Sequence, residues 1–200
     1  MQQGRGTPPH PRVGVLALQG GFRPHAEALA ALDVETVEVR LARDLAQVEA
    51  LVLPGGESTT VGRLLGTSGL LEPLRERLAG GLPVLGTCAG LILLASAVLD
   101  GRADQPVLGA IDLTVRRNAH GRQNESFEAP LEITGLSGGP FPGVFIRAPG
   151  IERVGQGVDV LARLSSGEPV AARQGAVTVC AFHPELAGDL RFHQHFLSSL

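Results

Sequence analysis

Short apolar runs alternate with stretches of helical periodicity along the first half of the chain. The runs have the length and composition of buried strands, whereas the stretches between them repeat apolar residues every three to four positions. The runs cover residues 13–18, 34–39, 50–53 and 82–86, and the predicted helices cover residues 25–32, 59–80 and 88–99. We expect Ser58 to cap the second helix and the glycines from Gly66 to Gly69 to break it.

The second half of the chain contains mostly strand-like runs. They cover residues 107–115, 126–133, 143–148, 158–164 and 176–182, and residues 189–200 form a predicted closing helix. Strands that alternate with helices predict a mainly parallel sheet with helices on both faces. We find no repeat and no interdomain linker. The pattern therefore predicts one α/β domain over residues 13–200, with a mixed sheet, after a mobile Pro/Gly-rich leader at residues 1–12.

Composition narrows the classes of function. A chain of 200 residues with 44% hydrophobic residues can bury one core of good size. The formal net charge of −3 gives no electrostatic case for binding nucleic acid or an anionic membrane. No apolar run is long enough to span a bilayer, and the leader lacks the apolar core of a signal peptide. The two cysteines, Cys88 and Cys180, lie in apolar surroundings, which argues against a disulfide framework and for a reducing cytoplasm.

Cys88 lies in the motif "GTCAG", where a predicted strand meets a predicted helix. This is the thiol form of a nucleophile elbow, a sharp turn that lifts the side chain above the edge of a sheet. Gly86 and Gly90 allow close backbone approach on either side, where a Cβ would clash. The helix N-terminus favours a thiolate, and the N–H of Ala89 would point at a developing oxyanion. The alternative is a buried structural cysteine.

A base for this thiol is found in "CAFHPEL". His183 follows a strand-like run, and Pro184 restricts it to an extended backbone. If the chain stays extended, Glu185 lies on the same side and can orient the imidazole while His183 takes the thiol proton. The alternative is an ordinary His-Pro-Glu turn.

The other histidines are weaker candidates for chemistry. His193 and His195 are two positions apart on a predicted helix and do not share a face, which argues against a metal pair. His25 is expected to open the first helix. The motif "PGGEST" at residues 54–59 is a glycine turn before a helix, and its free N–H groups can line a pocket. It lacks the lysine and the spacing of a phosphate-binding loop.

Together these motifs resemble class I glutamine amidotransferase domains, and most closely the family of glutaminase subunits of pyridoxal 5′-phosphate synthase. The similar blocks are "GVLALQGGFRPH", "LVLPGGESTT", "VLGTCAGLILLA", "RRNAHGRQNESFEAPL", "GVFIRAP" and "AFHPEL". They occur in order over nearly all of residues 13–200. "GRQNESFE" and "FIRAP" are the most specific, because other amidotransferase partners lack them. The resemblance implies a three-layer, flavodoxin-like α/β fold.

The resemblance also implies roles for individual residues. Cys88 is the implied nucleophile, His183 the general base and acid, and Glu185 the group that orients His183. The oxyanion would be held by the N–H groups of Ala89 and Gly56. The implied L-glutamine contacts are Gly56, Glu57, Ser58, Arg117, Ile146 and Arg147. The neighbouring Arg116 leaves open which of the two arginines reaches the substrate. No metal or cofactor is implied.

The implied partner is a separate (β/α)8 synthase subunit, with which the chain forms a large hetero-oligomer and to which it passes ammonia. The resemblance implies that glutaminase activity is low without this partner, and the motif "LQGG" suggests a mechanism for the coupling. Gln19, Gly20 and Gly21 follow the first strand, and parallel sheets gather their sites at the carboxyl ends of strands. Two alternatives remain at this point. The chain could serve another synthase, such as that of histidine biosynthesis, or it could be a non-enzymatic thiol sensor or chaperone of related fold.

Overall fold

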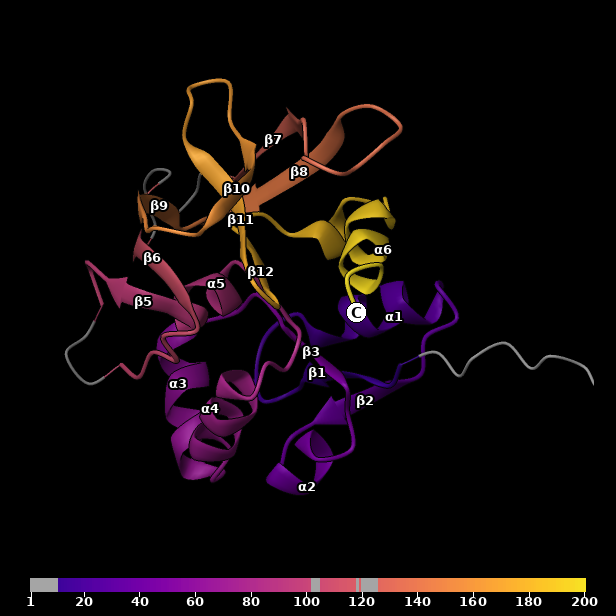
Figure 1. Ribbon diagram of the computed structural model, residues 1–200, viewed down its shortest axis with the longest axis vertical. Coiled ribbons are helices and arrows are strands. Elements are labelled where there is room, and N and C mark those ends of the chain that lie inside the picture. Colours follow the sequence, from indigo (N-terminus) through magenta and orange to yellow (C-terminus); the bar gives the residue numbers. More distant parts are fainter. Residues whose placement is uncertain (1–10, 102–104, 118, 120–125) are drawn as a thin grey trace, which may run out of the picture.

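The fold is organised around a mixed β-sheet (Figure 1). The structure, a computed structural model, describes residues 11–101, 105–117, 119 and 126–200. Most of the predicted leader and part of the "RRNAHGRQNESFE" block lie outside these residues. Along the described chain the elements are β1 (Val13–Leu16), α1 (Phe22–Ala30), β2 (Thr36–Val39), α2 (Ala42–Leu45), β3 (Ala50–Leu53), α3 (Ser58–Thr67), α4 (Leu71–Ala79), β4 (Val84–Thr87), α5 (Ala89–Leu94), β5 (Ala95–Val98), β6 (Ile111–Arg116), β7 (Ser126–Leu131), β8 (Phe141–Ile146), β9 (Gly150–Val154), β10 (Asp159–Arg163), β11 (Pro169–Gln174), β12 (Val177–Cys180), a 3₁₀ turn η1 (Pro184–Leu186) and α6 (Arg191–Leu197).

Among the described residues, seven strands form the main sheet in the order β10-β11-β12-β4-β3-β1-β2. β2, β1, β3, β4 and β12 run parallel, and β11 and β10 are antiparallel additions. β1, β3, β4 and β12 are buried along their whole length, as expected for parallel strands covered on both faces. Figure 1 shows α1 and α6 on one side of the sheet and α3 and α4 on the other. The predicted mixed, mainly parallel α/β fold is confirmed.

The remaining strands form two smaller sheets. β5, β6 and β9 make a three-stranded sheet, and β7 and β8 make an antiparallel pair. β6 and β8 alternate buried and partly exposed residues, so that each strand has one face against the core. No helix in the described part of the chain has the length and apolar composition needed to cross a bilayer.

Two predictions of local structure were wrong. The helix predicted over residues 88–99 ends at Leu94, and residues 95–98 form β5 instead. The reason is competition for carbonyl groups, because the Leu93 and Leu94 oxygens accept hydrogen bonds from the N–H groups of Leu108 and Ala110 (2.7 and 2.8 Å). These two carbonyls are therefore taken by the segment before β6, which carries the chain away from the helix.

The cap of α3 also differs from the prediction. Glu57 precedes the helix, and its carboxylate accepts hydrogen bonds from the N–H groups of Thr59 and Thr60 (3.3 and 2.8 Å). Ser58 is the first helical residue. A carboxylate suits this position because it also interacts favourably with the helix dipole. The predicted break is confirmed, since α3 ends at Thr67 and Gly69 has a φ of +72°.

Candidate active site

The carboxyl ends of four neighbouring parallel strands place the candidate residues together. In the sheet these strands lie side by side in the order β12, β4, β3 and β1. His183 follows β12, Cys88 follows β4, and Gly55 to Glu57 follow β3. Gln19 follows β1. Because parallel strands end at the same edge, segments far apart in the sequence meet there.

Cys88 lies at a sharp turn between β4 and α5. Its backbone has φ +49° and ψ −100°, a conformation that is rare outside glycine and typical of a strained functional turn. The Cys88 N–H donates to the carbonyl of Cys180 on the neighbouring strand (2.9 Å), which holds the turn in place. A Cβ on Gly90 would lie 2.1 Å from the Leu53 oxygen, so only glycine fits there. Ala89, the first residue of α5, presents one of the N–H groups that lack an intrahelical partner.

His183 and Glu185 form a hydrogen-bonded pair next to this turn. His183 Nδ1 and Glu185 Oε1 are 2.7 Å apart. The backbone route differs from the prediction, because the chain does not stay extended but turns into η1 at Pro184. The i to i+2 contact forms nevertheless. The Glu185 side chain is only 2% exposed, so its carboxylate is shielded from water.

Electrostatics favour an ionised pair here. Burial lowers the pKa of His183, but hydrogen bonds with Cys88 and Glu185 outweigh it and raise this pKa to about 10. Burial raises the pKa of Glu185, yet the imidazoles of His183 and His25 hold it well below its usual value. Burial raises the pKa of the other thiol, Cys180, which lies fully inside the core. The two cysteines therefore occupy different environments, and only Cys88 is set for proton transfer to an imidazole.

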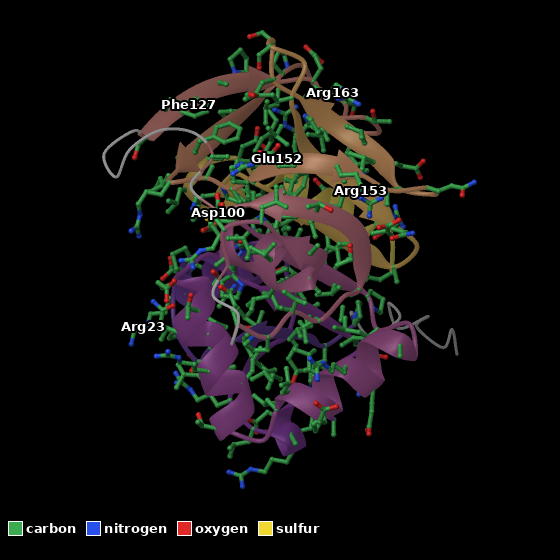
Figure 2. The ribbon with its side chains drawn as sticks, turned by 90° about the vertical axis from the view of Figure 1, so that its left-hand side faces the viewer. Arg23, Asp100, Phe127, Glu152, Arg153 and Arg163 are labelled. Atoms are coloured by element: carbon green, nitrogen blue, oxygen red, sulfur yellow. The ribbon has the colours of Figure 1, made fainter. Side chains whose placement is uncertain are left out.

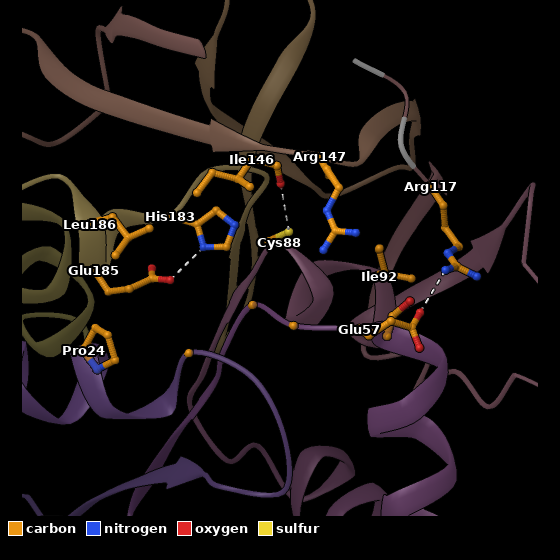
Figure 3. A pocket seen from close by; sticks show the side chains of 14 residues that line it. Pro24, Glu57, Cys88, Ile92, Arg117, Ile146, Arg147, His183, Glu185 and Leu186 are labelled. Atoms are coloured by element: carbon orange, nitrogen blue, oxygen red, sulfur yellow. Dashed lines mark hydrogen bonds and ion pairs between the residues drawn. The ribbon is translucent and has the colours of Figure 1, made fainter. Parts of the chain in front are cut away.

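A pocket of about 440 Å³ opens over the Cys88 thiol (Figure 3). Its lining includes the predicted triad and every predicted glutamine-contact residue, namely Gly56, Glu57, Ser58, Arg117, Ile146 and Arg147. Gly21 lines it as well, whereas Gln19, Gly20 and Ala89 do not. The thiol lies 4.0 Å from the Ile146 carbonyl, and Figure 3 shows Arg147 beside it. Arg147 has a φ of +45°, a second strained backbone at this site.

The structure distinguishes between the two neighbouring arginines. Arg117 reaches the pocket, where it pairs with Glu57 (3.0 Å) and bonds to Thr59 Oγ1 (3.1 Å). Arg116 instead pairs with Asp100 (3.0 Å) and Glu152 (2.8 Å), two residues that are labelled in Figure 2. Strand alternation explains the difference, since neighbouring residues at the end of β6 point in opposite directions.

The loop of Gln19, Gly20 and Gly21 is joined to the turn after β3 by two hydrogen bonds. The Glu57 N–H donates to Gln19 Oε1, and the Gly21 N–H donates to the Gly55 oxygen, both over 2.9 Å. A Cβ on Gly20 would lie 2.0 Å from that same oxygen. The loop thus fixes the orientation of the Gly55–Gly56 peptide, whose N–H is a candidate oxyanion donor.

The sequence motifs did not identify His25, which was expected only to open the first helix. His25 lies inside α1 with no exposed surface, and its Nε2 is 3.2 Å from Glu185 Oε2. The sequence signal that could have indicated a role for His25 is its position, as a polar residue, on the apolar face of an amphipathic helix. The described residues contain no cluster of three or more His, Cys, Asp or Glu side chains that could hold a metal ion.

Comparison with known proteins gives consistent matches. Residues 15–200 match the model of the "SNO glutamine amidotransferase family". The "Pyridoxal 5'-phosphate synthase subunit PdxT" of Frankia alni is 57% identical over 187 residues, which cover 94% of each chain. The protein of the same description from Herpetosiphon aurantiacus is 56% identical over 92% of this chain and 98% of its own.

Solved structures show the same likeness at the level of the fold. A crystal structure described as a glutamine amidotransferase superposes with a TM-score of 0.88 at 52% identity, covering 94% of this chain and 97% of its own. The structure of PurLQS from Thermotoga maritima superposes with a TM-score of 0.70 at 17% identity, over 94% of this chain and 98% of its own. The second match supports the fold alone.

Proposed function

The chain belongs to the SNO glutamine amidotransferase family, and we propose that it is the glutaminase subunit of a pyridoxal 5′-phosphate synthase. It hydrolyses L-glutamine to L-glutamate and ammonia. One observation supports these roles most directly. The Cys88 turn, the His183–Glu185 pair and the Glu57–Arg117 ion pair all line the same pocket. A nucleophile, an oriented base and two opposite charges are what hydrolysis of a zwitterionic amide requires.

The proposed reaction has two steps on Cys88. The thiolate attacks the side-chain amide carbon of glutamine, and N–H groups of Ala89 and Gly56 stabilise the resulting oxyanion. His183 takes the thiol proton and gives it to the departing ammonia, which leaves a thioester on the sulfur. Water then attacks the thioester with His183 as base, so that glutamate departs and the thiol is restored. Glu185 orients the imidazole and stabilises its charged form throughout.

Glutamine recognition is assigned to the charged groups of the pocket. Glu57 and Arg117 already stand 3.0 Å apart, and a zwitterion can take up both charges by binding between them. The α-ammonium of glutamine then pairs with Glu57 and the α-carboxylate with Arg117. Ser58, Ile146 and Arg147 line the path from these charges to the thiol. The pocket volume of about 440 Å³ lies within the range of small-molecule sites.

Ammonia released at Cys88 needs an acceptor. We assign that role to the (β/α)8 synthase subunit, in a large hetero-oligomer that makes pyridoxal 5′-phosphate. The loop of Gln19, Gly20 and Gly21 is the proposed coupling segment, because it holds both the Gly55–Gly56 peptide and Glu57. Docking that moves this loop would reorient the Gly56 N–H relative to the thiol. A reducing cytoplasm is the proposed compartment, since the nucleophile must stay a free thiol.

The proposed function is tested by glutamate release with and without the synthase subunit, using Cys88→Ala and Cys180→Ser. Cys88→Ala should abolish glutamine hydrolysis but leave the assembled synthase able to make product from added ammonium salt. Cys180→Ser should keep glutaminase activity and lose only stability, because that thiol is enclosed in the core. Loss of the ammonium-dependent activity in Cys88→Ala would show that Cys88 is structural and would refute the assignment.

A further inference from the structure

Three fully buried polar side chains lie behind the His183–Glu185 pair and take no part in the reaction described above. They are His25 on α1, Thr87 at the end of β4 and His193 on α6, each with no exposed surface. Buried polar groups are costly unless they are paired with one another. The three side chains lie together, and His25 contacts the other two as well as the Glu185 carboxylate.

His25 is at the centre of this group. Its Nε2 faces two oxygens, Thr87 Oγ1 at 3.1 Å and Glu185 Oε2 at 3.2 Å, and its Nδ1 lies 2.9 Å from His193 Nε2. Glu185 is thus held from both sides, by His183 at Oε1 and by His25 at Oε2. Apart from the approach of His25, Oε2 has no polar partner among the described residues.

The contacts of His193 fix where the protons lie. Its Nδ1 is buried without a hydrogen-bond partner among the described residues. A bare nitrogen is tolerated there better than an unpaired N–H donor, so the proton of His193 sits on Nε2 and is donated to His25 Nδ1. Burial lowers the pKa of His193 to about 3, which agrees with a neutral ring. The proton of His25 is then on Nε2, facing Thr87 and the Glu185 carboxylate.

We propose that His25 is a positioning residue of the glutaminase reaction, which holds the Glu185 carboxylate from the side opposite His183 while Thr87 and His193 hold His25. The inference rests on the proposed function. In this arrangement the N–H of His25 stabilises the carboxylate as an anion and fixes its rotation, and the carboxylate in turn orients His183. His25 does not contact the pocket, so it acts only through Glu185.

The same arrangement connects the catalytic pair to the proposed coupling segment. His25 is carried by α1, which begins one residue after Gly21. A Cβ on Gly21 would lie 3.5 Å from Glu185 Oε1, so the loop itself packs against the carboxylate. The titratable groups around Glu185 are His183 on its own segment, His25 on α1, His193 on α6, Cys88 before α5 and Cys180 on β12.

The test uses two variants of similar length that differ in one hydrogen-bond donor, measured in the assembled synthase. His25→Gln keeps a side-chain N–H near the Nε2 position, and His25→Met removes it. In His25→Met we expect kcat for glutamine hydrolysis to fall about 10-fold or more, since the buried carboxylate loses the N–H that approaches it to 3.2 Å. KM should be unchanged, because His25 does not touch glutamine. His25→Gln should recover most of kcat.

The pH profile separates positioning from a merely structural role. Without the His25 donor the Glu185 anion loses a stabilising partner, so its pKa rises and the acid limb of kcat moves to higher pH. His193→Asn, which removes the donor to His25 Nδ1, should move it in the same direction. His195→Asn, on the same helix and outside the group, should leave kcat and the profile unchanged. Product formation from ammonium salt reports that each variant is folded and assembled.

The inference is overturned if an assembled His25→Met keeps the parental kcat and acid limb, or if His25→Gln is no better than His25→Met. Should His25→Met fail to assemble, an unchanged kcat and acid limb in His193→Asn overturns it. Failure of the proposed function looks different, because the parental protein would then release no glutamate with its partner present, or would release it without Cys88.

Discussion

At the scale of single residues, the site is set up before any substrate arrives. Glu57 both caps α3 and pairs with Arg117, and Arg117 is further held by Thr59. A guanidinium fixed in this way loses little conformational freedom when it binds a carboxylate. In the proposed reaction the pair is a preformed receptor for the two charges of an amino acid, in the same pocket as the Cys88 thiol and the His183–Glu185 pair.

Arg117 and Arg116 provide a matched comparison of two adjacent arginines. Arg117→Ala should raise KM for glutamine about 10-fold or more, because a hydrogen-bonded charge is lost, and should change kcat much less. Arg116→Ala removes only exposed ion pairs and should change KM by less than about twofold. Steady-state glutamate release with the synthase subunit present measures both. Equal effects of the two variants would contradict the assignment of Arg117.

At the scale of elements, the turn between β4 and α5 depends on glycines for a geometric reason. A Cβ on Gly90 would meet the backbone oxygen of Leu53 at 2.1 Å, and β3 cannot move away without breaking its pairing with β1 and β4. By contrast, Gly66 lies on the exposed side of α3, and a Cβ there would meet nothing within 4 Å. The same residue type has a packing role in one helix and none in the other.

Replacement of each glycine by alanine should therefore have opposite effects on stability. Gly66→Ala should stabilise the protein by about 0.4–1 kcal/mol, since alanine has less conformational freedom to lose on folding. Gly90→Ala should destabilise it by about 1–3 kcal/mol or more, the usual cost of overpacking. Urea unfolding of both variants measures the free energy of unfolding. A stabilised Gly90→Ala variant would show that the turn can relax, contrary to this account.

The elements also show which features the sequence can predict. Fully apolar runs such as β3 and β4 were identified because parallel strands are buried on both faces. β5 was predicted as the end of a helix. The helix ends earlier because the carbonyls of Leu93 and Leu94 accept hydrogen bonds from Leu108 and Ala110, which are distant in the sequence. β9, β11 and the short α2 were not predicted, since their local patterns are too mixed to indicate an element without the surrounding tertiary contacts.

At the scale of the whole molecule, four distant segments meet at one edge of the parallel sheet, and the ends of β6 and β8 add Arg117, Ile146 and Arg147 to the pocket. A sequence motif can identify each segment but not its orientation. The motifs predicted Cys88, His183 and Glu185 as one group. They could not predict that Arg117 rather than Arg116 faces the pocket, because that depends on the twist and end of β6. Nor could they predict the approach of His25 to Glu185, which is made across the sheet edge from a helix on one of its faces.

The whole molecule is also the scale at which the partner acts. The isolated chain should be a poor glutaminase, and the synthase subunit should raise its turnover by about 10²- to 10³-fold if docking supplies one oxyanion donor. Gln19→Ala should remove much of this increase, because the loop loses its bond to the Glu57 N–H. Substitution of Gly20 is less informative, since any side chain there would meet the Gly55 oxygen.

Titration of the synthase subunit at saturating glutamine, with glutamate as the readout, measures the increase. Gln47→Ala is the matched control, because Gln47 is exposed and precedes β3 at the opposite edge of the sheet. Full activity of the chain alone, unchanged by its partner, would refute the coupling.

The position of β12 has a consequence for how the protein is made. This strand pairs with β4 on one side and β11 on the other, yet it follows every other strand of the sheet along the chain. A chain interrupted after Cys88 but before residue 177 lacks β12, so one edge of β4 stays unpaired, and it carries the Cys88 thiol with neither His183 nor Glu185. Open strand edges of this kind promote aggregation and proteolysis. Because the base follows the last strand of the sheet, we expect such incomplete translation products to lack glutaminase activity and to aggregate readily.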